Sequence, residues 1–140
     1  MGGTNAGAFV PDGRITNQQM WLVLARVTGN HPASMAEARQ WAIQNAVAEG
    51  ANPNVSVTRQ QMVIALYRCT ALLGRSTASH GSLAGYVDSK TVPNAARNAM
   101  TWAITNGIIS GTADKRLNPS GTITRAQFAV ILYRYYRQIM

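Results

Sequence analysis

Two arginines at equivalent places carry the chemistry that this sequence offers. Arg59 directly follows Thr58, and Arg125 follows Thr124 in the same way. Each arginine is therefore expected at the first position of a helix, where a cation is mildly unfavourable because of the helix dipole. The free amides of a helix start attract anions, and an arginine beside them can hold a carboxylate in bidentate fashion. The pattern favours binding of an anionic group.

Other side chains that do chemistry are sparse. Only five of the 140 residues are acidic, and no acidic pair is repeated, so general acid–base catalysis is not indicated. His31 and His80 stand in expected loops without metal-ligand partners. Neither a glycine-rich phosphate loop nor a nucleophile motif is present. We therefore predict a protein that is not an enzyme and uses no cofactor or metal ion.

The arginines belong to a motif that occurs three times, here called the threonine motif. It reads PDGRITNQQMWLVLAR at 11–26, PNVSVTRQQMVIALYR at 53–68 and PSGTITRAQFAVILYR at 119–134. In each, a glutamine follows a threonine by three residues, which is the pattern of a helix capping box. Apolar residues then recur every three or four positions, as in a helix with one buried face. Asn17 replaces the arginine in the first motif, so a site built there should be weaker or absent.

A second repeated motif, here called the tryptophan motif, precedes the second and third threonine motifs. It reads WAIQNAVAEG at 41–50 and WAITNGIISG at 102–111. We expect a second type of helix here, ending at Gly50 in one unit and near Gly107 in the other. The full unit is therefore helix, loop, helix, and the chain is a tandem repeat.

Several residues of these units have predicted structural roles. Ser34 and Glu37 have the spacing of another capping box. Asn45 and Asn106, one turn after each tryptophan, suit amides that bond to the backbone. Cys69 lies on an apolar stripe and is expected to be buried. Cations complement the dipole at helix ends, and we expect this role for the arginines that close the three threonine motifs: Arg26, Arg68 and Arg134.

Composition indicates one domain with a polyanionic partner. The length of 140 residues suits a single domain, and 46% of the residues are apolar. Thirteen basic residues against five acidic ones give a net charge of +8, which favours nucleic acid, an anionic glycopolymer or an anionic membrane surface. No segment is long and apolar enough for membrane insertion, and the first residues lack the pattern of a signal peptide.

The third unit resembles an S-layer homology repeat. Its landmarks follow in order from residue 85 to 134: aromatic-x-Asp at Tyr86–Asp88, a tryptophan-bearing helix, a Gly-Ile-Ile-x-Gly turn, a loop with proline, and Ile-Thr-Arg-Ala-Gln before an apolar helix. Residues 31–74 match more loosely, and residues 8–29 contain only the loop and the second helix. We divide the single domain 1–140 into a half repeat (1–30), a second repeat (31–79) and a third repeat (80–140).

The resemblance implies an all-α fold in which the repeats form a pseudo-threefold, three-pronged bundle with an incomplete first repeat. It also implies a non-catalytic module, which anchors a protein to an anionic, possibly pyruvylated, secondary cell-wall polysaccharide at the extracellular surface of a bacterium. Binding grooves would lie between neighbouring repeats. The tryptophans could stack on sugar rings, although their repeated context favours core packing. The ligand-binding residues that the resemblance implicates are Arg59, Arg125, Trp41, Trp102, Gly107, Ser110, Gly111 and Gln127.

The incomplete first repeat leads to a further expectation. Threefold closure needs six helices, and the chain supplies five. We expect an apolar patch near Met20 and Trp21, covered by a second molecule in a homo-oligomer, by an upstream segment, or by the tail at 135–140.

Two alternatives stay open. One is a structural or oligomeric scaffold, for example phage-associated, that reuses the repeat. The other is a basic helical module for protein or nucleic acid. Nucleic acid is the less favoured partner, since the arginines are spread through the repeat instead of clustering on one helix.

Overall fold

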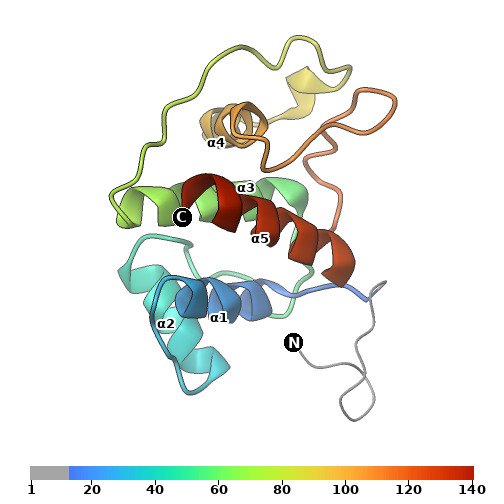
Figure 1. The fold of residues 1–140 in the computed structure, drawn as a ribbon. Coiled ribbons are helices and arrows are strands. Elements are labelled where there is room, and N and C mark those ends of the chain that lie inside the picture. The colour runs from blue at the N-terminus through green and yellow to red at the C-terminus, as the bar shows by residue number, and fades with distance from the viewer. Residues whose placement is uncertain (1–12) are drawn as a thin grey trace.

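The structure is a computed structural model that describes residues 13–140. It is helical, without a β-strand among these residues, so the predicted all-α fold is confirmed (Figure 1). The elements in chain order are α1 (Asn17–Val27), α2 (Met35–Gln44), α3 (Arg59–Leu72), the short 3₁₀ turn η1 (Ser89–Thr91), α4 (Asn94–Thr105) and α5 (Arg125–Ile139).

Three helices begin with the capping box that the sequence predicts. In α1, α3 and α5 the threonine hydroxyl accepts the third amide of the helix, and the glutamine side chain accepts the amide of the threonine. These reciprocal bonds satisfy amides that a helix start would otherwise leave unpaired. The N-caps are Thr16, Thr58 and Thr124.

The capping box predicted at the start of α2 is only half formed. The hydroxyl of Ser34 accepts a hydrogen bond from the Glu37 amide at 3.2 Å, as expected. The Glu37 carboxylate, however, accepts from the Ala33 amide at 3.1 Å. That bond lies one residue before the cap, so the prediction of a reciprocal pair was wrong for this helix.

The two asparagines after the tryptophans have the predicted role. The side chain of Asn45 donates to the carbonyl of Trp41 at 2.8 Å. Asn106 does the same to Trp102 at 2.9 Å. Each asparagine thereby caps the C-terminus of its helix, because its side chain and its own backbone amide both donate to this carbonyl of the last turn.

The helices of the tryptophan motif end earlier than predicted in one unit. α2 ends at Gln44, well before Gly50, and the chain turns at Ala46 with a φ of 57°. In the third unit the equivalent residue is Gly107, with a φ of 67°. The same left-handed turn is therefore built once on alanine and once on glycine.

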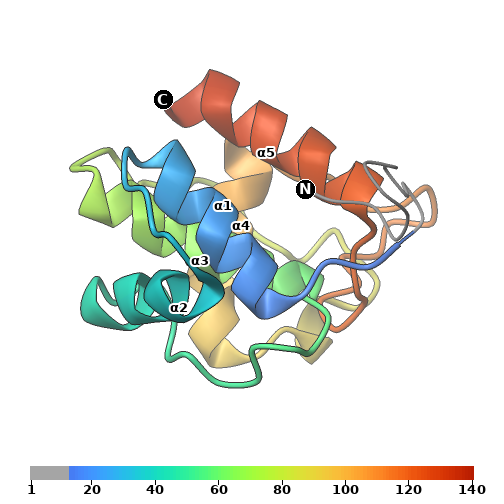
Figure 2. The same ribbon diagram turned by 90° about the horizontal axis from the view of Figure 1, so that it is seen from below.

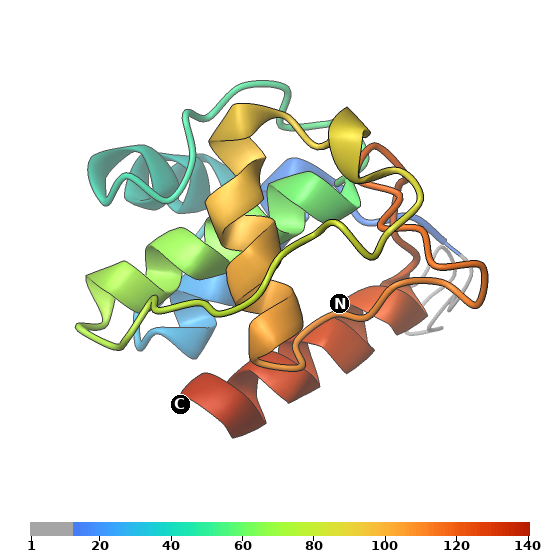
Figure 3. The same ribbon diagram turned by 90° about the horizontal axis from the view of Figure 1, so that it is seen from above.

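The helices pack in pairs that cross the boundaries of the sequence repeat. α2 packs on α1, and α4 packs on α3. Figure 3 shows α4 crossing over α3. Each tryptophan-bearing helix thus covers the threonine-capped helix that precedes it in the chain. α5 lies at one edge of the molecule, with no described helix on its outer side (Figures 2 and 3).

The segments that lead into α1, α3 and α5 meet in a three-way junction. Isolated β-bridges join each pair of segments: Arg14 with Thr124, Thr16 with Ser56, and Thr58 with Thr122. Ile15, Val57 and Ile123 are fully buried where the segments meet. These local contacts are what a threefold bundle would need at its centre, while the threefold arrangement of the whole bundle stays a prediction.

Trp102 ties α3, α4 and α5 together. Its ring packs edge-on against Tyr67, with centroids 5.6 Å apart, and against Tyr135, at 6.2 Å. The hydroxyls of Tyr135 and Thr70 are 3.1 Å apart and hydrogen-bonded. Cys69 is buried as predicted, and burial raises the pKa of its thiol to about 12. The thiol is therefore inert at neutral pH.

The apolar patch is not where the sequence placed it. Met20 and Trp21 are both only 2% exposed. That expectation requires each tryptophan-bearing helix to cover the capped helix of its own repeat, which would leave α1 without a cover. In fact α2, from the next repeat, packs on α1. Three of the exposed large apolar side chains lie on α5: Val130, Tyr133 and Tyr136. The others are spread over the rest of the described chain: Ile43, Val55, Leu72, Val87 and Met140.

Candidate functional site

Two grooves of equivalent construction lie between neighbouring repeats, each about 250 Å³ in volume. The first is lined by α1, the turn after α2, α3 and the start of α4: Asn17, Met20, Trp21, Val47, Ala48, Glu49, Gly50, Ala51, Asn52, Gln61, Ile64, Ala65, Arg68 and Ala95. The second is lined by the start of α3, the turn after α4, and α5: Arg59, Ile109, Ser110, Ala126, Gln127, Val130, Ile131 and Arg134.

The internal repeat relates every residue of the second groove except Ala126 to a residue of the first. Both grooves are lined by the glutamine of a helix cap and by the arginine that follows it on the same helix. The other polar positions differ. Asn17 in the first groove corresponds to Arg59 in the second, Glu49 corresponds to Ser110, and Asn52 lines the first groove alone. The second groove is therefore more positive than the first.

Arg59 is fixed across the second groove by the backbone of the third unit. Its Nε donates to the carbonyl of Leu117 at 2.8 Å, and one terminal nitrogen donates to that of Ser110 at 3.0 Å. Burial lowers the pKa of the Arg59 guanidinium, and the carboxylate of Asp88 opposes this shift. A guanidinium is not deprotonated in proteins, so Arg59 presents a positioned positive charge.

Asp88, the acid of the aromatic-x-Asp landmark, holds the loop on which Arg59 rests. Its two carboxylate oxygens accept from the amides of Leu117, at 2.8 Å, and Asn118, at 2.9 Å. Burial alone would raise the pKa of Asp88, but these hydrogen bonds outweigh it and the pKa is lowered. Asp88 does not itself line the groove. It is an anion that holds in place the loop to which Arg59 is hydrogen-bonded.

Arg134 is a groove residue that the sequence analysis missed. It was expected at a helix end, as was Arg68, but both helices continue past these arginines and the prediction was wrong. Arg134 lies seven residues after Gln127, so both project from one face of α5. The same spacing separates Arg68 from the glutamine of the first groove, and this spacing was the signal that could have identified both. Arg26 does lie in the last turn of α1, as expected.

The expectation of free amides beside the motif arginines was also wrong. The amide of Arg59 donates to the carbonyl of Gly121 at 2.8 Å, and that of Gln60 to Pro119 at 2.9 Å. At α5 the Arg125 amide donates in the same way to Gly13, at 2.8 Å. These amides hold the three-way junction together. Recognition of an anion must therefore come from side chains.

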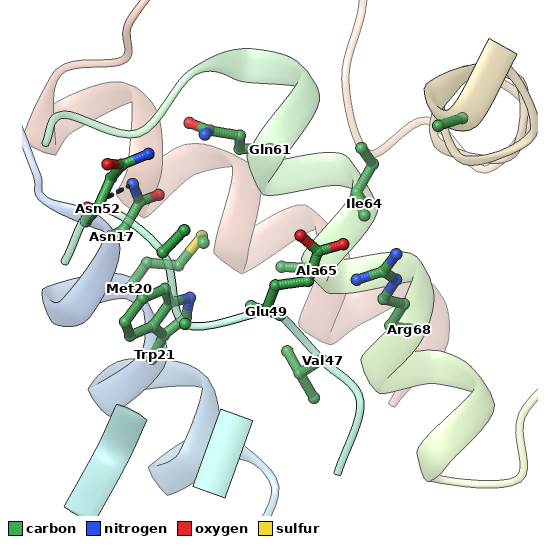
Figure 4. Close-up of a pocket in the computed structure, with 14 residues that line it drawn as sticks. Asn17, Met20, Trp21, Val47, Glu49, Asn52, Gln61, Ile64, Ala65 and Arg68 are labelled. Atoms are coloured by element: carbon green, nitrogen blue, oxygen red, sulfur yellow. Dashed lines mark hydrogen bonds between the residues drawn. The ribbon is translucent and has the colours of Figure 1, made fainter. Parts of the chain in front are cut away.

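The first groove is built differently (Figure 4). The side chain of Asn17 donates to the carbonyl of Asn52 at 3.0 Å and adds no charge. Figure 4 shows Glu49 and Arg68 pointing toward one another from opposite walls. The indole N–H of Trp21, which also lines this groove, is buried without a hydrogen-bond partner among the described residues. The carboxylate makes this groove a poorer receptor for anions.

The structure brings together three of the eight residues implicated by the resemblance, namely Arg59, Ser110 and Gln127. The side-chain oxygen of Gln127 is engaged in the helix cap, at 2.9 Å from the Thr124 nitrogen. Five residues do not line the second groove: Trp41, Trp102, Gly107, Gly111 and Arg125.

The two tryptophans and one of these glycines have structural explanations. Trp41 and Trp102 are buried in the core. Gly111 lies directly beneath the ring of Tyr86, where an added Cβ would clash. The glycine thus allows the aromatic landmark of the third unit to pack against the turn.

Within 13–140, no three histidine, cysteine, aspartate or glutamate side chains are grouped so that they could hold a metal ion. None of the described helices is long and apolar enough to cross a membrane.

Comparison with known proteins agrees with the landmarks of the third unit. Residues 85–129 match the S-layer homology domain. An amylopullulanase from Thermoanaerobacterium thermosulfurigenes is 30% identical over 102 residues, which cover 70% of this chain and 6% of that protein. A surface-layer 125 kDa protein from Lysinibacillus sphaericus is 31% identical over 100 residues, 66% of this chain and 8% of that one.

A third relative is an exoglucanase, XynX, from Acetivibrio thermocellus. It is 31% identical over 81 residues, which cover 58% of this chain and 8% of the enzyme. The chain thus spans 6% to 8% of the length of these three relatives. The ordered landmarks, the helical fold and the domain match agree that residues 85–129 are an S-layer homology domain.

Proposed function

We propose that this chain anchors a protein to a bacterial surface by binding an anionic cell-wall polysaccharide in the second groove. S-layer homology domains are non-catalytic cell-wall anchoring modules, and a relative named as a surface-layer protein supports a surface-anchoring role. Binding would be an equilibrium without chemistry. Where relatives are enzymes, their activity would reside in the more than nine-tenths of their length that this chain does not match.

The observation that carries the proposal is that two arginines from neighbouring repeats line one groove together with apolar side chains. Arg59 comes from the start of α3 and Arg134 from the middle of α5. A carboxylate between them would gain charge-assisted hydrogen bonds, which are stronger than neutral ones. The wall of Ile109, Val130 and Ile131 suits an apolar sugar face or the methyl group of a pyruvate ketal.

Titration of purified cell-wall polysaccharide into the chain by calorimetry tests this assignment. Arg134→Gln should weaken binding about ten-fold or more, because one hydrogen bond to a charged group contributes roughly 1.5–3 kcal/mol. Arg26→Gln is the matched control, since Arg26 holds the same place in the first threonine motif but lies outside both grooves. Chemical removal of the polymer's carboxylates should abolish the difference between the two variants.

Two results would count against the assignment. Equal affinities of Arg134→Gln and Arg26→Gln for the polysaccharide would show that the second groove is not its binding site. Binding to duplex DNA at physiological salt that exceeds binding to the polysaccharide would favour the basic-module alternative, because non-specific DNA binding is dominated by phosphate contacts.

A further inference from the structure

Three polar groups that line the first groove have no partner in the described part of the chain. The indole nitrogen of Trp21 is buried, in a side chain only 2% exposed, and finds no hydrogen-bond partner among residues 13–140. The carboxylate of Glu49 and the guanidinium of Arg68 point toward one another across the groove (Figure 4), yet they form no ion pair. A buried donor without a partner is costly, and native structures leave few such groups. The groove is therefore suited to an acceptor from outside the chain.

This combination of groups belongs to the first groove alone. The residue that corresponds to Trp21 in α3 is Val63, which does not line the second groove. Ser110 stands where the first groove has Glu49. The indole nitrogen of Trp102 is also unpaired among the described residues, but Trp102 lines neither groove. The repeat itself thus does not account for a buried donor and a carboxylate at this place.

Two other polar side chains of the first groove are already used by the fold. Asn17 is buried and donates to the carbonyl of Asn52 at 3.0 Å. The side-chain oxygen of Gln61 accepts the Thr58 amide at 2.9 Å in the cap of α3. Recognition of a ligand therefore falls mainly to the three unpaired groups. The apolar part of the wall comes from Met20, Val47, Ile64 and Ala65.

The two charges restrict the class of ligand. An anion bound at Arg68 would also face Glu49, and a cation bound at Glu49 would face Arg68, so a ligand of one sign meets repulsion. The hydroxyl groups of an uncharged sugar could bond to both side chains but would neutralise neither. A zwitterion, with one ammonium and one carboxylate, is the complement of the pair. The groove volume of about 250 Å³ lies below the roughly 300–1,000 Å³ of sites for drug-sized ligands, so the zwitterion must be small.

We propose that the first groove binds an α-amino acid in its zwitterionic form. The ammonium lies against the Glu49 carboxylate and forms charge-assisted hydrogen bonds with it. The carboxylate of the ligand lies against Arg68, whose planar guanidinium can bind both oxygens, and it also accepts the indole N–H of Trp21. The side chain of the amino acid packs on the apolar wall. This site uses a different groove and a different ligand from the polysaccharide site and does not rest on it.

Alanine and two single-charge analogues test the proposal. L- and D-alanine, propionate, which lacks the ammonium, and ethylamine, which lacks the carboxylate, are each titrated into the full chain labelled with nitrogen-15. The indole N–H resonance of Trp21, identified by its loss in Trp21→Phe, reports occupancy of the groove. We expect a saturable shift with one form of alanine and binding about five-fold weaker with either analogue, as loss of one contact to an exposed charge implies.

Removal of the charge on each wall is the second arm of the experiment. Glu49→Gln and Arg68→Gln should each weaken alanine binding about five-fold. Both residues are exposed, so these variants should keep the urea midpoint of the parent. Glu37→Gln and Arg26→Gln are the matched controls, since both residues are exposed and lie outside the first groove. Alanine binding should be unchanged in the controls.

Three results would overturn the proposal. One is propionate binding as tightly as alanine, because the groove would then recognise a carboxylate alone. The others are the absence of a saturable shift and a tighter response to methyl glucoside, an uncharged sugar. None of these results alters the polysaccharide titration with Arg134→Gln, which concerns the second groove, so the two proposals fail separately.

The same amino-acid chemistry has two sources, a free amino acid and the free end of a diamino acid in a wall peptide. A soluble wall peptide with such a free end is therefore titrated in the same way. Binding tighter than that of alanine assigns the wall peptide as the source, and weaker binding assigns the free amino acid.

Discussion

At the scale of single residues, the same backbone turn is occupied by alanine in one repeat and by glycine in the other, at Ala46 and Gly107. Both have a positive φ, 57° and 67°. An L-residue other than glycine is strained there by roughly 1–2 kcal/mol, while glycine adopts this conformation readily. Nothing lies within 4 Å of a Cβ added at Gly107, so conformation, and not crowding, distinguishes the two positions.

Exchanging alanine and glycine at these two positions should change the free energy of unfolding in opposite directions. Ala46→Gly should raise the free energy of unfolding by about 1 kcal/mol, and Gly107→Ala should lower it by about the same amount. Urea denaturation followed by circular dichroism measures both. Ala129→Gly is the control, since an exposed alanine in mid-helix should lose about 1 kcal/mol on the same replacement. Destabilisation by Ala46→Gly would show that the strain is absent.

At the scale of elements, the helix starts decide much of the fold, and α5 is the simplest to test. Thr124→Ala removes the hydroxyl that accepts the Gln127 amide at 3.1 Å. The expected loss is about 1 kcal/mol, seen as a lower urea midpoint and faster amide exchange in the first turn of α5. Thr122→Ala, at an exposed residue without a capping role, should have little effect. Equal losses for the two variants would contradict the capping role.

The elements also show what the sequence could and could not predict. A threonine and glutamine three residues apart specify a helix start by themselves, so all three capped helices were found from short-range spacing. Which helix packs on which was not predictable in this way, because α1 presents an apolar face that either neighbour in sequence could cover. The spacing from Gln127 does place Arg134 on the same face of α5, but the sequence does not show that a groove lies along that face. The turn after α4 and Arg59, which form the rest of the groove, are brought to α5 only by the three-way junction.

At the scale of the whole molecule, the junction of three segments couples all the repeats. Val57 is its central residue. Its amide donates to the carbonyl of Ile15 at 2.8 Å, and its carbonyl accepts from Ile123 at 3.1 Å. Because all three side chains are fully buried, a change at Val57 is felt by each repeat.

Val57→Ala should therefore lower the free energy of unfolding by about 2 kcal/mol, from lost burial plus a small cavity. Tryptophan fluorescence and far-ultraviolet circular dichroism should still report one coincident transition. Val55→Ala is the matched control two residues earlier, because Val55 is 54% exposed and should lose much less. Two separate transitions in the Val57 variant would show that the repeats fold independently.

The packing of α2 on α1 and of α4 on α3 also bears on how such chains can be recombined. The unit of sequence and the unit of packing are out of phase by half a repeat. An exchange between related proteins that moves residues 53–118 as a block keeps α3 together with α4. An exchange of 31–79, although it follows the sequence repeat, separates α2 from α1 and α3 from α4. Viable chimaeras should therefore have their crossovers in the loops that follow the tryptophan-bearing helices.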